Sequence, residues 1–152
     1  MASNDRKLIL NDFIAYRMAN FASQISDSCS QIYQQEFGLS IPEWRILARL
    51  AENGRMNAKD LVHITFMDKS KVSRTVKVMD EKGLLIKEKV PNDNRATYLS
   101  LSNKGNNLFQ QLVPKALSWE DQLIDCLSAS EYRNFMQALE KLEQQAKRME
   151  DN

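Results

Sequence analysis

Apolar residues recur every three or four positions along the first part of the chain, which is the period of one helix face. The pattern predicts one long helix from about Leu8 to Phe37, and Gly38 follows where a C-cap glycine is typical. The recurring apolar positions are Ile14, Met18, Phe21, Ile25, Cys29 and Ile32. Ser40, Pro42 and Glu43 then have the signature of a capped helix start, so a second helix is expected to reach about Glu52.

Two short helices and a hairpin are predicted in the middle of the chain. Asn57 opens a helix that closes near Met67, and Asp68 is a suitable N-cap for a helix that ends at Lys82. Two β-favouring segments, 84–90 and 97–101, enclose the turn formers of residues 91–95. Two short helices with a tight break form a helix-turn-helix, and the hairpin after them makes it a winged helix.

The last part of the chain again has helical periodicity. Ser102 precedes a helix from about Lys104 to Leu127, which we expect to be interrupted or kinked near Pro114, since proline cannot donate to the helical hydrogen bonds. Ser128 and Glu131 form a capping box for the final helix, whose apolar positions are Tyr132, Phe135, Leu139, Leu142, Ala146 and Met149. This seam has more apolar surface than a small winged helix can cover, and it predicts a stable dimer.

Charge is distributed unevenly along the 152 residues, although the formal net charge is only +1. The stretch from Gly54 to Lys104 contains 11 Lys and Arg residues against 6 acids, whereas the flanks contain 10 basic and 14 acidic residues. A basic centre between acidic ends is typical of a protein whose middle segment meets a polyanion. A solvated charged surface without a partner is the alternative interpretation.

The helix expected over residues 68–82 carries the candidate chemistry. With Val72, Val76 and Met79 facing inward, short hydroxyls and long cations lie on the opposite face or in the first turn, and no acid occurs between residues 69 and 79. The candidate DNA-binding residues on this helix are Lys69, Ser70, Lys71, Ser73, Arg74 and Lys77. Such a face fits a major groove, where Arg reads guanine and Lys or Ser holds phosphates.

The turn of the hairpin adds two candidates. Arg95 at the hairpin tip can enter a narrow minor groove, where negative potential is concentrated. Asp93 either holds the Arg95 guanidinium in register or forms an Asx turn.

These segments together resemble the MarR (multiple antibiotic resistance regulator) family of transcription factors. The resemblance rests on the stretches 41–47, 67–74, 82–86 and 99–105 and on the Asp93-x-Arg95 pair. It implies a homodimeric regulator, here taken as a repressor, that binds pseudo-palindromic double-stranded DNA. Arg74 would match a base-contacting residue, Arg95 the minor-groove arginine and Asp93 its acidic support.

The expected fold class is therefore mainly α with a small β element. The length predicts a single domain, 1–152, in which residues 41–102 are the winged helix-turn-helix lobe that binds DNA. Residues 8–37 and 103–150 are the expected dimerisation helices.

The resemblance also implies a small aromatic or anionic effector between the dimer helices and the winged helix. The candidate ligand-binding residues on the bordering segments are Tyr33, Phe37, Trp44, Arg45, His63 and Phe66. For Phe37, Trp44 and Phe66 a place in the core is the competing interpretation.

Other functions remain as alternatives to this one. Cys29 or Cys126 would serve a redox-sensing regulator, although Cys29 lies on an apolar stripe, where thiols tend to be inert. A winged helix that binds an acidic protein is a further alternative. A single histidine, His63, and the lack of a catalytic motif argue against an enzyme. We expect no metal, no cofactor, no membrane contact and a cytoplasmic location, since no apolar run is long enough to span a bilayer and no signal peptide is evident.

Overall fold

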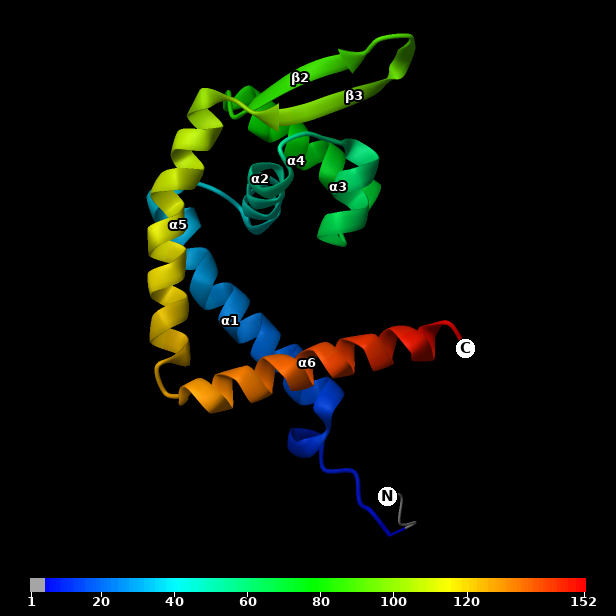
Figure 1. Ribbon diagram of the computed structural model, residues 1–152, viewed down its shortest axis with the longest axis vertical. Helices are drawn as coiled ribbons and strands as arrows, with labels where there is room; N and C mark the ends of the chain where they lie inside the picture. Colours follow the sequence, from blue (N-terminus) through cyan, green and yellow to red (C-terminus); the bar gives the residue numbers. More distant parts are fainter. Residues whose placement is uncertain (1–4) are drawn as a thin grey trace. The chain divides into compact units, whose positions relative to one another are not determined.

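A computed structural model describes residues 5–152, apart from the side chains of residues 93–96 (Figure 1). The chain forms two compact units, one ending at Lys115 and the other beginning at Ala116, and each is described by itself. The helices are α1 (Ile14–Phe37), α2 (Ile41–Asn53), α3 (Ala58–Thr65), α4 (Lys69–Glu81), α5 (Asn103–Ile124) and α6 (Ala129–Glu150), after a 3-10 turn at Leu10–Asp12. The strands are β1 (Met56–Asn57), β2 (Leu85–Val90) and β3 (Asp93–Leu101).

The winged helix-turn-helix expected from the sequence is present in the first unit. Helices α2, α3 and α4 pack together beneath the β2–β3 hairpin (Figure 1). The three strands form an antiparallel sheet in the order β1-β3-β2, with Met56 opposite Leu99 and Leu85 opposite Leu101. The two-residue strand β1 was not predicted.

The core of this unit comes from the inward faces of these elements. The side chains with less than 2% exposure are Leu39, Ile46, Leu47, Leu50, Leu61, Val72, Met79, Leu84 and Leu112. Phe66 lies outside this core, because it is 92% exposed and ends α3 in the left-handed region, with φ of 57°. The interpretation of Phe66 as a core residue is therefore wrong, since the backbone turns its side chain outward between α3 and α4.

Side-chain caps set the helix starts as predicted. Ser40 and Glu43 form a full capping box on α2, and Ser128 and Glu131 form another on α6. The backbone N–H and hydroxyl of Ser128 hold the pKa of the Glu131 carboxyl below its usual value. Asn57 caps α3 in the same reciprocal way with Asp60.

Helix α5 runs through Pro114 without interruption, so a break there is not observed. Proline removes one backbone donor, and the rest of the helix stays continuous on both sides of it. The boundary between the two compact units falls one residue beyond Pro114, between Lys115 and Ala116.

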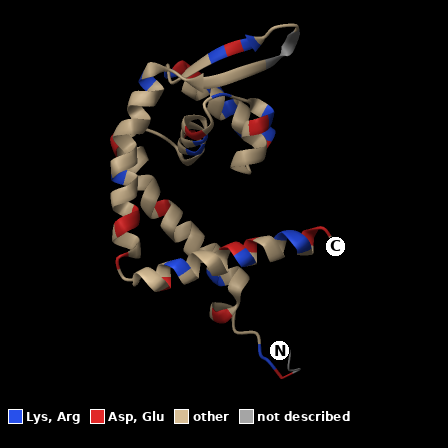
Figure 2. Ribbon diagram, viewed as in Figure 1, with Lys and Arg blue, Asp and Glu red and all other residues tan. Residues whose placement is uncertain are grey.

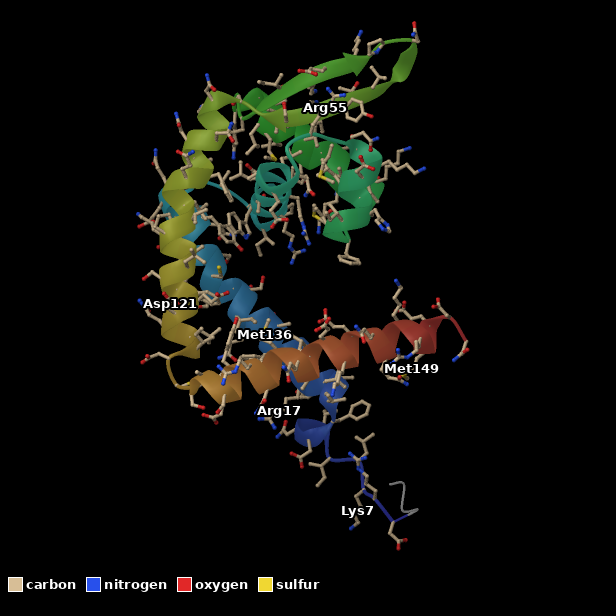
Figure 3. All side chains as sticks on the ribbon, in the orientation of Figure 1. Lys7, Arg17, Arg55, Asp121, Met136 and Met149 are labelled. Carbon is tan, nitrogen blue, oxygen red and sulfur yellow. The ribbon has the colours of Figure 1, made fainter. Side chains whose placement is uncertain are left out.

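The apolar stripes of the first and last helices contain no fully buried residue and are partly exposed. On α1, Ile14 and Phe21 are exposed, and α6 has no buried residue at all. On α6, Leu142 is 48% and Met149 67% exposed. Met136 and Met149 are two exposed side chains of this helix that are labelled in Figure 3. Each unit therefore has a helix with apolar side chains that its own residues leave exposed.

Candidate nucleic-acid interface

Helix α4 presents a hydroxyl and cation face to solvent. Asp68 caps the helix by accepting a 2.7 Å hydrogen bond from the Lys71 N–H, and the helix buries Val72, Thr75 and Met79. All six candidate residues predicted on this helix are exposed: Lys69, Ser70, Lys71, Ser73, Arg74 and Lys77. Within the described part of the chain, none of the four cations among them forms an ion pair. The face is therefore free to meet an anionic partner.

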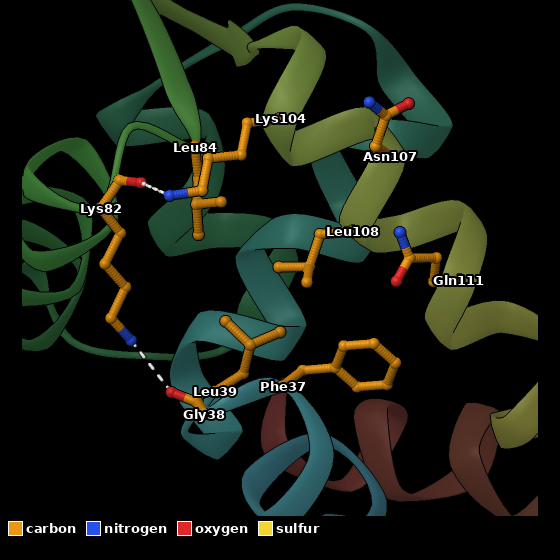
Figure 4. A pocket seen from close by; sticks show the side chains of 9 residues that line it. All are labelled: Phe37, Gly38, Leu39, Lys82, Leu84, Lys104, Asn107, Leu108 and Gln111. Carbon is orange, nitrogen blue, oxygen red and sulfur yellow. Dashed lines mark hydrogen bonds between the residues drawn. The ribbon is translucent and has the colours of Figure 1, made fainter.

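The end of α4 is fixed by Lys82. Its Nζ donates to the carbonyl of Gly38 at 3.0 Å and to Oε2 of Glu43 at 2.7 Å. Glu43 is buried, and its Oε1 also accepts from the backbone and hydroxyl of Ser40. Lys104 in turn donates to the Lys82 carbonyl at 2.8 Å (Figure 4). These contacts tie the end of α4 to the starts of α2 and α5.

The middle of the hairpin is held by Arg55, which lies directly before β1. Its guanidinium lies over the Tyr98 ring, 4.1 Å from the centroid, and 3.3 Å from Oε2 of Glu88 (Figure 3). Tyr98 is on β3 and Glu88 on β2, so one side chain contacts both strands of the hairpin. No local pattern predicts this contact, because Arg55 and Glu88 are far apart along the chain.

The tip of the hairpin carries the two predicted wing residues. The backbone of β3 begins at Asp93, which pairs with Val90, and the register shifts between Lys89 and Val90. The side chains of Asp93 and Arg95 lie outside the described residues. Their proposed contact with each other and with DNA stays a prediction.

A groove beside α4 brings together lysines from three elements. Its volume is about 550 Å³, and we call it the lysine groove. It is lined by Ala58, Lys59, Val62, Lys69, Ser73, Val76, Lys77 and Lys87. Lys and Arg residues lie on α3, α4 and the hairpin of this same lobe (Figure 2). The sequence places Lys59 and Lys87 in the basic stretch but assigns them to no site, because only the fold brings α3 and β2 next to α4.

The candidate ligand-binding residues do not form a single site. Tyr33 is stacked on Trp44, with ring centroids 5.4 Å apart, and Trp44 is stacked on Phe109 of α5 at 6.2 Å. Burial, followed by the nearby Cys29 thiol, raises the pKa of the Tyr33 phenol above its ordinary value. Tyr33 is thus a core residue of an aromatic stack that joins α1, α2 and α5.

The other candidates lie along two separate grooves. Trp44, Arg45 and Phe66 line a groove of about 400 Å³ between α2 and the end of α3. Phe37 lines a different groove of about 590 Å³, with Lys82 and Lys104 (Figure 4). His63 is exposed on α3 and lines neither of them.

The two cysteines lie far apart along the chain, Cys29 on α1 and Cys126 in the turn that follows α5. Cys29 is half-buried and Cys126 is exposed, and neither forms a disulfide. In this part of the chain, no three His, Cys, Asp or Glu side chains are grouped to hold a metal ion. No described helix is both long and apolar enough to cross a membrane.

The geometry is that of a winged helix-turn-helix protein with long flanking helices, and the comparisons with known proteins agree. A sequence model of the MarR family matches residues 37–96. A MarR/EmrR family transcriptional regulator from Acinetobacter sp. ADP1 has a similar structure, with a TM-score of 0.82 and 25% identity, over 93% of this chain and 99% of that one. The chain therefore has the winged-helix fold of MarR-family transcriptional regulators, and its residues 37–96 match the sequence model of that family.

Two further relatives extend this comparison. The regulator FarR of Neisseria gonorrhoeae is 30% identical over 70 residues, which are 46% of this chain and 48% of FarR, so the match spans about half of that relative. BpsR of Bordetella bronchiseptica, whose DNA binding is regulated by 6-hydroxynicotinic acid, has the same fold with a TM-score of 0.79 and 20% identity, over 91% of this chain and 98% of BpsR.

Proposed function

We propose that this protein is a dimeric transcriptional repressor that binds a specific DNA sequence and is controlled by a small aromatic or anionic ligand. The observation that carries the DNA-binding part is the exposed face of α4. Its lysines, serines and arginine are unpaired within the described chain and project from a helix that capping and packing hold in place. Arg and Ser or Lys on one helix face suit base edges and phosphates in a major groove.

The hairpin supports the same partner. A recognition helix in the major groove leaves the wing beside the neighbouring minor groove, and Arg55 contacts both strands in the middle of that wing. Arg95 at the tip is the proposed minor-groove residue, with Asp93 as its orienting partner. The comparison with BpsR, a DNA-binding protein of this fold, is compatible with the proposal.

Dimer formation is supported by the uncovered apolar faces. Ile14 and Phe21 on α1 are exposed, and so are Phe135, Leu142 and Met149 on the α6 seam. Apolar side chains that are exposed along a helix face are typical of a surface that binds another protein. A second copy of the chain supplies a matching surface, because two-fold dimers bury the same patch on both subunits. A dimer that occupies two adjacent turns of duplex would block access to a promoter, which is the proposed repressor action.

Ligand control is supported by the two grooves that contain the candidate residues. The groove with Trp44, Arg45 and Phe66 combines aromatic surface with a cation, and the groove with Phe37 contains Lys82 and Lys104. Lys82 and Lys104 already bind carbonyls and Glu43, so Arg45 is the more available cation. We therefore favour the groove at Trp44 and Arg45 for an aromatic anion.

Selection of bound duplexes from a random pool tests the DNA-binding proposal. The expected product is a pseudo-palindrome whose half-sites lie about 10 base pairs apart, one helical turn on the same face of DNA. A chain that retains no duplex, even at low salt, would contradict it and would leave the basic face to an acidic protein partner.

A further inference from the structure

The lysine groove has a charge arrangement that the recognition helix alone does not explain. Lys59 comes from α3, Lys69 and Lys77 from α4, and Lys87 from β2, and all four are exposed. No acidic side chain is among the residues that line the groove. Half-buried Val62 and Val76 provide an apolar part of the lining. A groove with lysines at its edges and valines in its wall fits a sugar–phosphate strand, in which negatively charged phosphates alternate with sugar rings.

The groove occupies one flank of α4. Residues 69, 73, 76 and 77 line it, whereas Arg74, which lies about 100° further round the helix than Ser73, does not. Lys87 places the β2–β3 hairpin on the other side of the groove. The groove therefore lies between the helix that would enter a major groove and the hairpin that would reach the next minor groove. In a duplex, those two grooves are separated by one sugar–phosphate strand.

We propose that the lysine groove holds this strand, and that Lys59 and Lys87 bind phosphates in addition to the residues of α4. The inference rests on the proposed DNA binding and extends it to two residues on other elements. Lys59 and Lys87 would anchor the lobe on any sequence, because phosphates carry no sequence information. Arg74 would remain responsible for reading bases.

Asp80 opposes phosphate binding in the lysine groove. Its Oδ2 lies 3.3 Å from Nζ of Lys87, and both side chains are about half-exposed, at 44% and 45%. A phosphate that binds Lys87 must compete with this carboxylate. Asp80 therefore lowers the affinity of the lysine groove for DNA, and removing the Asp80 charge should raise that affinity.

Salt-dependent binding of the full chain tests the proposal. The dissociation constant is measured by fluorescence anisotropy with the selected operator duplex and with a scrambled duplex, across a series of KCl concentrations. For Lys59→Gln and Lys87→Gln, the slope of log affinity against log salt should become shallower by about 0.9 for each phosphate that a bound protomer no longer neutralises. The ratio of operator to scrambled affinity should stay at the wild-type value. Asp80→Asn should bind both duplexes more tightly, with a steeper slope.

The matched control removes the same charge outside the groove. Lys115 lies on α5, about three turns beyond Asn103. The Lys115→Gln variant should keep the wild-type slope of log affinity against log salt. Circular dichroism and thermal midpoints establish that each variant is folded. Wild-type slopes for both Lys59→Gln and Lys87→Gln, with operator binding intact, would overturn this inference and leave the proposed function standing. A wild-type chain that binds no duplex would instead overturn the proposed function itself.

Discussion

The phenol ring of Tyr33 is stacked on the indole of Trp44, with centroids 5.4 Å apart and an interplanar angle of 16°. Tyr33 belongs to α1 and Trp44 to α2, so the stack joins the first long helix to the winged helix. Tyr33 is only 2% exposed, and burial favours its neutral form.

This burial predicts an alkaline loss of stability. The pKa of Tyr33 is raised in the folded chain, so the unfolded chain ionises first, at about pH 10. The contribution of the neutral Tyr33 phenol to the free energy of unfolding is fully present below that pH, and it is lost as pH rises through the folded-state pKa. Tyr33→Phe keeps the ring and should make the free energy of unfolding fall less steeply above pH 10. Urea unfolding across this range measures the difference, and an unchanged slope for Tyr33→Phe would contradict the assigned role of Tyr33.

Two Lys–Glu pairs of similar length should differ in their effect on stability. Lys82 Nζ lies 2.7 Å from Glu43, whose side chain is 8% exposed, while Lys115 lies 2.6 Å from Glu36, which is 48% exposed. Lys82→Met leaves a buried carboxylate without its cation, and we expect a loss of about 1–3 kcal/mol. Lys115→Met should cost less than about 1 kcal/mol, because exposed pairs are screened by solvent. Urea unfolding at one fixed protein concentration compares them, and equal losses would contradict the assigned role of Lys82.

Gly105 permits α5 to start close against Leu84. A Cβ at this position would clash with the Leu84 carbonyl oxygen, which also accepts from the Ser102 N–H at 2.9 Å. Gly105→Ala should therefore lower the free energy of unfolding by about 1–3 kcal/mol despite the better helix propensity of alanine. The neighbouring Asn106→Ala is the control, since Asn106 is exposed and its replacement should be neutral or slightly stabilising.

Arg74 and Lys77 should have different effects on DNA recognition. Arg74→Ala should cost about 1–3 kcal/mol on the operator and relax base preference, because the truncated side chain no longer reaches the base edge. Lys77→Ala should weaken binding to all sequences and reduce the salt slope by about 1. Equal losses for Arg74→Ala on operator and random duplexes would remove it from base readout.

The α6 seam should determine assembly. We expect a dimer by light scattering at micromolar concentration, and Leu139→Glu with Leu142→Glu should unfold or aggregate the chain, because charges would replace the apolar seam. Gln137→Glu with Gln144→Glu adds the same charge at exposed positions about half a turn away and should leave the dimer intact. A monomeric mass for wild type would refute the proposed dimer.

Local features of the fold could be predicted because their signals lie close together in the sequence. The Ser40–Glu43 and Ser128–Glu131 capping boxes span three residues each, and both occur where predicted. The helix-turn-helix and the hairpin follow from the same kind of local pattern. Strand β1 was missed, because two residues carry no periodicity and its pairing with β3 joins segments about 40 residues apart.

The candidate site could be predicted only for the residues that lie on one helix. All six candidates on α4 are exposed, since inward and outward positions of a helix can be read from its period. Lys59 and Lys87 reach the same groove from other elements, and no local pattern relates them to α4. The Lys82–Glu43 contact was missed for the same reason, because its partners lie 39 positions apart.

Phe66 separates the requirements of folding from those of function. At 92% exposure its ring gains almost no burial, and a φ of 57° is a conformation that disfavours bulky residues by about 1–2 kcal/mol. Glycine or asparagine would adopt this turn with less strain, so the stability of the chain gives no reason for an aromatic residue here. If related chains keep an aromatic residue at position 66, the reason is a contact that the exposed ring makes with another molecule. It is not the stability of the folded monomer.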